Sequence, residues 1–421
     1  MIGVPYLRPA ENKEIIFVRH AESQANVDGV WNGRTDGPLS DDGASSLEAL
    51  GRRLAGWDVD RVVSSPLERT RLTAESFSDS AEIDERFIEI DLGRWEGMQL
   101  SEIQENEGAE LEEAIQTRTQ PMGGTGESLM DAGRRALNAV DSVAASMGDS
   151  ERVVIVTHGG FMQAVLHRHL GGGKHRSHAF TANTGITRVV WQFGGPRLAS
   201  FNDTGHLGPR TGAVRAALDD GLEVVALVRH GQTRANVEGR WQGQGDWDLN
   251  EVGLDQAAAL GSWYGKAGIV YSSPLSRAAT TARHVAANGV TPNEGLMELN
   301  MGKWEGLTTD EILEDWPRLM EQIFRDGVDL RRGETGESWG ELTARFSNVI
   351  EGVERRSGAP TVVVAHGGAI RSYVSSLTKN DDSHAESLFT PANTSVSHVA
   401  MTVRGPEIQD YSVAPHLETL G

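Results

Sequence analysis

A chain of 421 residues carries the same polar turn twice, and this repeat constrains the fold more than any other feature. The segment FVRHAESQANVDGVWNG at 17–33 returns as LVRHGQTRANVEGRWQG at 227–243. A repeat of about 210 residues has the length of a whole domain, not of a solenoid unit. We therefore predict two tandem copies of one domain, at 1–208 and 222–421. The segment 209–221 has the Gly, Pro and charge of a linker.

Further short segments recur in the same order in both halves. The first half reads SSPLERT, EIDLGRWEG, TGES and VTHGG, and the second reads SSPLSRA, ELNMGKWEG, TGES and VAHGG. Because complete sets of polar residues recur in register, the Arg-His pairs are poorly explained as structural ion pairs at a strand end.

Each half has the pattern of an α/β domain. Apolar runs rich in Val and Ile, such as EIIFVRH and RVVIVTH, end abruptly at polar residues, which is typical of buried parallel strands. Helical periodicity lies between them, as in 41–57. This alternation predicts two tandem three-layer α/β/α domains, each a mostly parallel sheet flanked by helices. Ligands of such sheets bind beyond the carboxyl ends of the strands, where the Arg-His and His-Gly-Gly segments lie.

Composition excludes several classes of function. A formal net charge of −21 disfavours nucleic acid and anionic membranes as partners. The absence of cysteine excludes disulfides, thiol nucleophiles and Cys-ligated zinc. We see neither a signal peptide at the start nor an apolar run of membrane-spanning length, so we expect a cytoplasmic protein.

The second half shows which chemistry these residues suit. Its predicted strand ends carry Arg229, His230, Arg277, Glu298 and His366. Arginine grips phosphate with a planar fork, and the glycine pair after His366 leaves backbone N–H groups free at a helix start. One histidine can attack phosphorus, the other can stabilise the transferring oxygens, and a carboxyl can protonate the leaving oxygen. The Arg and His groups carry the positive charge, so this chemistry requires neither metal nor cofactor.

In combination, these motifs resemble the histidine phosphatase superfamily, in its branch of cofactor-dependent phosphoglycerate mutases and related phosphatases. The resemblance covers nearly the whole chain, twice. It implies that His20 and His230 are nucleophiles that become phosphohistidine, and that Glu89 and Glu298 are proton donors. The remaining site residues that we predict are Arg19, Asn26, Asn32, Arg69, His158 and Gly159 in the first copy, and Arg229, Asn236, Gln242, Arg277, His366 and Gly367 in the second.

The first copy departs from the family pattern at Ala21, where the second copy has Gly231. Alanine removes no catalytic group, but a backbone that requires a positive φ there would be strained. We expect both sites to be active. A single active domain paired with a regulatory domain that binds phosphorylated ligands is the alternative.

Other residues of the same motifs are expected to have structural roles. Trp95 and Trp304 should pack in the core or lid. Ser128 and Ser338, in the GES motif, should cap helices. The adjacent carboxylates Glu96 and Glu305 are the residues most easily confused with the proton donors.

The segment between the WEG and GES motifs is expected to form part of a lid, and it differs most between the copies. The first copy is Glu-rich there with Arg118 as its only base, whereas the second places Arg331 and Arg332 just before GETGES. We therefore expect the two sites to prefer different substrates, the second favouring an additional anionic group.

The sequence thus predicts a metal-independent phosphomonoesterase that acts on small phosphorylated metabolites, of the sugar phosphate or phosphoglycerate type. A mutase is the alternative, although neither half has the longer basic, proline-rich insertion of the family's mutases. A binding protein for phosphorylated ligands is a second alternative. We also expect the two domains to pair with each other within the chain.

Overall fold

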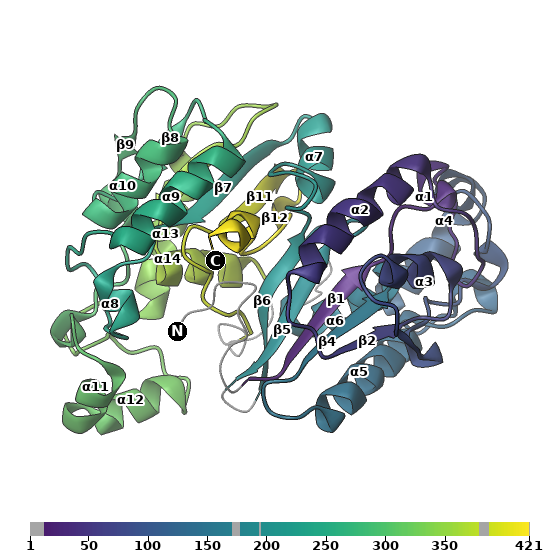
Figure 1. Cartoon of the computed structure of the whole chain (residues 1–421), viewed down its shortest axis with the longest axis horizontal. Coiled ribbons are helices and arrows are strands. Elements are labelled where there is room, and N and C mark those ends of the chain that lie inside the picture. The colour runs from purple at the N-terminus through teal and green to yellow at the C-terminus, as the bar shows by residue number, and fades with distance from the viewer. Residues whose placement is uncertain (1–11, 171–176, 193–194, 379–386, 421) are drawn as a thin grey trace. The chain divides into compact units, whose positions relative to one another are not determined.

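A computed structural model of the protein describes residues 12–170, 177–192, 195–378 and 387–420. The described residues form two compact units (Figure 1). The first unit takes those from 12 to 207 except 177–179, which belong to the second unit together with those from 208 to 420. Each unit is described by itself.

The sheet of the first unit has six strands in the order β3-β2-β4-β1-β5-β6. They are β1 (Glu14–Arg19), β2 (Arg61–Ser64), β3 (Glu82–Ile83), β4 (Arg152–Thr157), β5 (Ile186–Gln192) and β6 (Gly195–Asp203). Strands β1 to β4 are parallel, while β5 runs antiparallel to β1 and β6 antiparallel to β5. The central strand β4 is buried along its whole length, as its continuous apolar run predicts.

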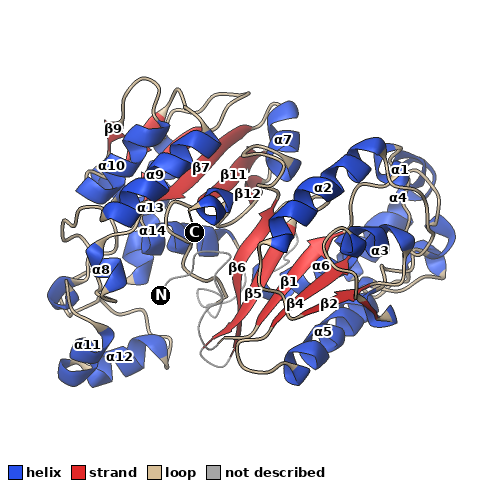
Figure 2. Ribbon diagram, viewed as in Figure 1, coloured by secondary structure: helices blue, strands red, loops and turns tan. Residues whose placement is uncertain are grey.

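Helices lie on either side of this sheet, with α2 and α5 on opposite sides (Figure 2). They are α1 (Gln24–Val27), α2 (Asp41–Ala55), α3 (Glu68–Glu75), α4 (Leu100–Thr117), α5 (Leu129–Ser146) and α6 (Gly159–Leu170). Ser40 caps α2 by accepting a hydrogen bond from the Gly43 N–H at 2.9 Å. This arrangement confirms the predicted three-layer fold.

The second unit repeats the same topology, with the order β9-β8-β10-β7-β11-β12 when read in the same direction. Its strands are β7 (Glu223–Arg229), β8 (Val270–Ser272), β9 (Thr291–Pro292), β10 (Thr361–Ala365), β11 (Val396–Thr402) and β12 (Gly405–Ile408). Its helices are α7 (Gly212–Asp219), α8 (Arg234–Val237), α9 (Glu251–Tyr264), α10 (Ser276–Val285), α11 (Thr309–Asp315), α12 (Pro317–Phe324), α13 (Trp339–Gly352) and α14 (Gly367–Leu377).

Helix α7 lies inside the segment that the sequence indicates as a linker. Its Ala217 packs with Val224 of β7 and Ala400 of β11. This part of the chain is therefore an ordered element of the second unit.

The lid segments differ in their helices. In the first unit α4 is one helix with a kink at Glu107, where φ is −136°. In the second unit Pro317 begins α12 directly after α11, since proline lacks the N–H that would continue the first helix. Trp95 and Trp304 are fully buried beneath these helices, which confirms their packing role.

Ser128 and Ser338 cap helices, as predicted. The Ser128 hydroxyl accepts from the Asp131 N–H at 3.1 Å at the start of α5, and Ser338 forms a capping box with Glu341 at the start of α13. Within the described part of the chain, none of the helices combines the length and apolar character that crossing a bilayer requires.

Candidate active sites

The sheet register brings the two histidines of each copy together. Strands β1 and β4 are parallel neighbours that end at the same level, and His20 and His158 are the residues that follow them. Their ring centres lie 5.3 Å apart. The second copy repeats this arrangement after β7 and β10, with 5.2 Å between the rings of His230 and His366.

The hydrogen bond of the His20 ring indicates which of its nitrogens carries the proton. Its Nδ1 lies 2.7 Å from the Ala21 carbonyl oxygen, which can only accept, so Nδ1 carries the proton and Nε2 the lone pair. Burial, together with Arg19 and Arg69, holds the pKa of His20 well below its usual value. The second copy has the same contact, 2.7 Å from His230 Nδ1 to the next carbonyl.

The second histidine of each pair is fixed by a serine. His158 Nε2 lies 2.7 Å from Ser65 Oγ, and His366 Nε2 lies 2.8 Å from Ser273 Oγ. The Nδ1 atoms of both histidines are buried without a hydrogen-bond partner. Each Nδ1 is therefore a polar group left for a ligand. Sequence reasoning missed the serines, although they recur as the second serine of both SSPL motifs.

Backbone carbonyls of the loops after α1 and α8 orient one arginine in each copy. These are Arg69 near the start of α3 and Arg277 near the start of α10. Arg69 donates to Thr35 O at 2.8 Å and to Gly33 O at 2.7 Å, and Arg277 donates to two carbonyls at 2.8 Å each. Both terminal nitrogens of Arg277 are thus engaged, while its Nε is buried without a partner. This geometry leaves one directed N–H for an anion.

Arg19 and Arg229, which end β1 and β7, are also held by a backbone carbonyl. Arg19 donates through one terminal nitrogen to Thr181 O, and Arg229 donates to Pro391 O at 2.7 Å. The Nε atoms of both arginines are buried without a partner. Burial lowers the pKa of Arg229 to about 10, opposed by nearby Glu298, so the guanidinium stays charged at neutral pH.

The predicted proton donors lie at the N-termini of α6 and α14. Glu89 accepts hydrogen bonds from the Gly160 and Phe161 N–H groups at 2.9 Å each. Glu298 accepts from the Gly368 N–H at 2.9 Å. Each carboxyl group is therefore held directly beside the His-Gly-Gly segment of its own copy.

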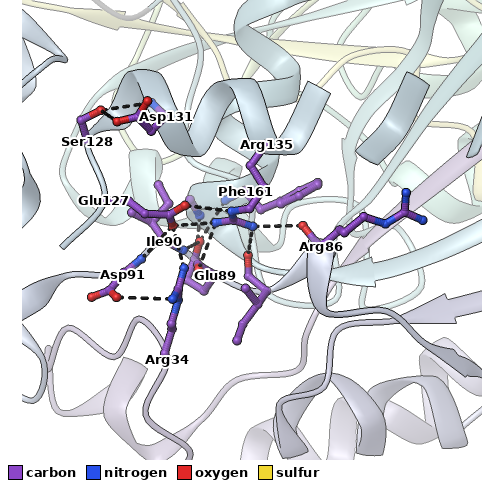
Figure 3. A network of polar contacts seen from close by, with 12 residues as sticks. Arg34, Arg86, Glu89, Ile90, Asp91, Glu127, Ser128, Asp131, Arg135 and Phe161 are labelled. Carbon is purple, nitrogen blue, oxygen red and sulfur yellow. Dashed lines mark hydrogen bonds and ion pairs between the residues drawn. The ribbon is translucent and has the colours of Figure 1, made fainter. Parts of the chain in front are cut away.

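A partly buried arginine, Arg135, clamps the chain that carries Glu89 (Figure 3). Arg135 forms a two-pronged contact with Glu127, at 2.9 and 2.8 Å, and donates to Ile88 O at 2.8 Å. Arg345 and its glutamate repeat this clamp in the second copy. The Glu of each GES motif thus positions a predicted proton donor through an arginine. Sequence reasoning did not identify these arginines, although they recur at equal distances after GES.

Glu96 and Glu305, the carboxylates easily confused with the donors, shape a loop instead. Glu96 accepts from the N–H groups of Gly33 and Arg34 at 3.1 and 2.9 Å. Glu305 accepts from those of Gln244 and Gly245 at 2.9 and 3.0 Å. These loops supply the carbonyls that hold the two phosphate-pocket arginines.

The predicted amide ligands lie at the short helices α1 and α8 and in the following loop. The Asn26 and Asn236 side-chain oxygens accept from the N–H of the capping residue, each at 3.1 Å. Gln242 Oε1 accepts from Thr233 Oγ1 at 3.0 Å. For Asn32 the contact is through its backbone carbonyl oxygen, which lies 3.5 Å from Arg69 Nη2. Contact of these amides with phosphate stays a prediction.

A further pair of asparagines was missed by sequence reasoning. Asn183 Nδ2 donates to the His20 carbonyl at 3.0 Å, and Asn393 Nδ2 donates to the His230 carbonyl at 2.9 Å. Their recurrence in register was the available signal. These bonds fix the backbone of each predicted nucleophile.

Ala21 leaves the geometry of the first site intact. Neither Ala21 nor Gly231 has a positive φ, so the glycine does not serve a left-handed backbone. The Ala21 N–H donates to a threonine hydroxyl, Thr73 Oγ1, at 2.9 Å, and Gly231 makes the same contact at 3.0 Å. In the second copy a Cβ at this position would lie 2.5 Å from Gly253 O. The second copy therefore needs glycine because its backbone lies close to Gly253, whereas Ala21 causes no backbone strain in the first copy.

Substituting Gly368 is expected to displace Glu298 without removing it. A Cβ at Gly368 would lie 2.6 Å from Glu298 Oε1. In a chain whose first site is inactivated, we expect Gly368→Ala to lower kcat for an alkyl phosphate by about 10²-fold, as for a lost general acid. Gly352→Ala is the control, because a Cβ there meets nothing within 4 Å. An unchanged kcat would show that close approach does not position the carboxyl.

Stability should fall as the solution becomes acidic. Burial holds the pKa values of all four active-site histidines well below 6.5. Below pH 6.5 the unfolded chain therefore binds protons that the folded chain does not. Each histidine should then lower the free energy of unfolding by up to about 1.4 kcal/mol per pH unit. Denaturant titrations from about pH 7.5 to about pH 5 check this, and a flat profile would contradict it.

Comparison with known proteins gives matches to each half separately. A sequence model of the histidine phosphatase superfamily (branch 1) matches residues 15–204 and again residues 225–414. A metal-independent phosphoserine phosphatase of Arabidopsis thaliana is 35% identical over 205 residues, covering 47% of this chain and 84% of that protein. Phosphoserine phosphatase 1 of Hydrogenobacter thermophilus is 32% identical over 162 residues, covering 38% of this chain and 76% of that protein.

Solved structures also match one half at a time. A mycobacterial glucosyl-3-phosphoglycerate phosphatase in complex with VO3 is 28% identical, with a TM-score of 0.41. The match covers 45% of this chain and 99% of that one. A mutant phosphoserine phosphatase of Entamoeba histolytica in complex with phosphoserine is 26% identical, covering 46% and 99% of the two chains, with a TM-score of 0.41.

Proposed function

Because this chain belongs to the histidine phosphatase superfamily, branch 1, and is a phosphatase, we propose that each of its copies is a complete active site. The observation that carries this proposal is the matched pair of histidine sites. In both copies a neutral imidazole with its Nδ1 hydrogen-bonded to a carbonyl lies beside a second histidine whose Nδ1 has no partner. A binding protein would not need the nucleophile held in one tautomer in both copies.

The proposed reaction is hydrolysis in two steps. The Nε2 lone pair of His20 attacks phosphorus and forms a P–N bond, while the bond to the leaving oxygen breaks and that oxygen takes a proton from Glu89. Water then attacks phosphorus as the Glu89 carboxylate accepts its proton. The P–N bond breaks, and phosphate and the free histidine are released. His230 and Glu298 play the same parts in the second copy.

The positive groups of the pocket stabilise the transferring phosphoryl oxygens. Arg19, Arg69 and His158 surround His20, and the Nε of Arg19 and the Nδ1 of His158 are buried without partners. Two fixed guanidinium charges supply the electrostatic stabilisation that a metal ion provides in other phosphatases. This supports metal-independent hydrolysis, in keeping with the name of the Arabidopsis relative.

The proposed substrates are small phosphorylated metabolites. The names of the relatives point to phosphoserine and to glucosyl-3-phosphoglycerate as the kinds of ester to test. We expect the full chain to release phosphate from one or more of phosphoserine, phosphoglycerate and sugar phosphates, at an unchanged rate with a chelator present. Loss of activity with chelator, restored by a divalent metal, would contradict the proposal. Isomerisation of phosphoglycerate without free phosphate would indicate a mutase instead.

A further inference from the structure

The two copies differ in charge on one side of the phosphate pocket. The motifs TGES, HGG and Asn-Thr set the equivalence of five positions that change together. The first copy has Met122, Leu129, Gln163, Phe180 and Phe201, and the second has Arg332, Trp339, Arg371, Thr390 and Tyr411. We call the second set the basic rim. Neutral residues in one copy are thus replaced by a set with two guanidinium groups in the other.

Arg371 lies on α14, close to the phosphate pocket. Its guanidinium carbon is 4.8 Å from the ring centre of Trp339, and its Nη1 is 3.5 Å from Thr390 Oγ1. A Cβ on Gly367 would lie 2.6 Å from Thr390 Cγ2 and 3.1 Å from Arg229 Nε. One side chain, Thr390, therefore separates Arg371 from the predicted phosphate ligands.

Arg332 brings a second, buried positive charge to the basic rim. The residue is only 6% exposed, and its ion pair with Asp329 has a distance of 3.6 Å. The Asp329 oxygens already accept from the N–H groups of Trp339 and Gly340, at 2.7 and 2.9 Å. Burial lowers the pKa of Arg332, the charge of Asp329 and a hydrogen bond to it oppose this shift, and the charge of Arg371 adds to it. An anion between the two arginines would relieve this cost.

The first copy offers no such charge at the equivalent positions. Met122 is buried, Phe180 is 60% exposed, and Gln163 Nε2 is buried without a partner. Arg34 lies in the loop after α1, next to the first pocket. It forms ion pairs with Asp91 at 3.3 Å and with Glu127 at 3.0 Å. The environment beside the first pocket is therefore neutral and partly apolar.

We propose that the second site selects phosphomonoesters that carry a second anionic group, a carboxylate or a second phosphate, which Arg371 and Arg332 bind. The first site lacks this preference. The inference rests on the proposed function, because it assigns substrate classes to the two sites. A charge-assisted hydrogen bond of this kind contributes about 1.5–3 kcal/mol, which corresponds to roughly 10- to 100-fold in specificity.

The test uses the full chain with one site inactivated and two esters that differ in a single group. The substrates are 3-phosphoglycerate and glycerol 3-phosphate, which replaces the carboxylate with an uncharged hydroxymethyl group. In a His20→Ala chain, we expect Arg371→Gln to lower the ratio of their kcat/KM values, anionic over neutral, by at least about tenfold. Fructose 1,6-bisphosphate against fructose 6-phosphate tests whether a second phosphate replaces the carboxylate.

Arg331→Gln is the matched control, because it removes the same charge from the residue next to Arg332 in the chain. Arg331 is exposed and pairs with Glu341, so its loss should leave the ratio unchanged. In a His230→Ala chain, Gln163→Arg should raise the ratio at the first site. An unchanged ratio in Arg371→Gln, or an equal loss for both esters, would overturn the inference.

Binding separates this inference from the proposed function. If none of the esters is hydrolysed, the proposed function fails, but calorimetric titration of the His20→Ala chain with the same two esters still measures the preference. Tighter binding of 3-phosphoglycerate that is lost in Arg371→Gln would support the basic rim. Equal binding of both esters would refute it.

Discussion

Replacing both His20 and His230 by alanine is expected to abolish phosphate release, while each single replacement leaves the turnover of the other copy. The reason is that both copies hold their nucleophile alike, with ring separations of 5.3 and 5.2 Å and equal 2.7 Å contacts at Nδ1. Without the imidazole no P–N bond can form, so we expect the double variant to lose at least about 10³-fold in kcat. Phosphate release from an aryl phosphate, with a chelator present, measures this.

The informative result is the difference between the two single variants. His284→Ala serves as the control, since this histidine lies in the last turn of α10. If His230→Ala alone removed all activity, the first copy would be silent despite its intact geometry. Ala21 and the neutral surroundings of that pocket would then be the features to test as the cause of its inactivity. If His20→Ala alone removed it, the second copy would be the silent one.

Replacing Glu298 by glutamine is expected to produce a loss that depends on the leaving group. The glutamine oxygen can still accept the Gly368 N–H bond, which is 2.9 Å long, but the side chain cannot donate a proton as an acid does. With the first site inactivated, kcat for an alkyl phosphate should fall by about 10²- to 10⁴-fold. An aryl phosphate with a good leaving group should lose less than about tenfold, because its oxygen needs no proton to depart.

Glu305→Gln distinguishes the chemistry from the architecture. Glu305 accepts two loop N–H groups, at 2.9 and 3.0 Å, and the same loop holds Arg277. Its replacement should therefore weaken phosphate binding and raise KM for both kinds of ester alike. A leaving-group dependence in Glu305→Gln, and none in Glu298→Gln, would reverse the assignment of the proton donor.

Much of the architecture could be predicted because the relevant signals are local. The strands are short apolar runs that end at polar residues, and the parallel register then brings the ends of the parallel strands to one edge of the sheet. The positions of His20, Arg19 and His158 follow from this rule. Ser128 and Ser338 could be placed for a similar reason, since a capping serine acts within one helical turn.

The contacts that hold the site residues in place could not be predicted, because they span long separations in the chain, and Glu89 was identified only through the family resemblance. Glu89 is bound by a backbone N–H 71 residues away, and Arg135 reaches carbonyls 47 and 49 residues away. Nothing in the local pattern distinguishes Glu89 from Glu96. Only the folded loop shows that Glu96 binds backbone N–H groups of residues 33–35.

The sequence by itself determined that the chain holds two copies of one α/β domain, and which side chains stand at the ends of their strands. Its repeats and short motifs contain this information directly. The tertiary structure alone decided three matters: that Ala21 needs no unusual backbone, that Arg371 packs over Trp339 beside Thr390, and that Arg331 pairs with Glu341. The contact of Arg371 depends on the packing of segments that are distant in sequence. The other two depend on backbone and side-chain conformations that the sequence pattern does not specify.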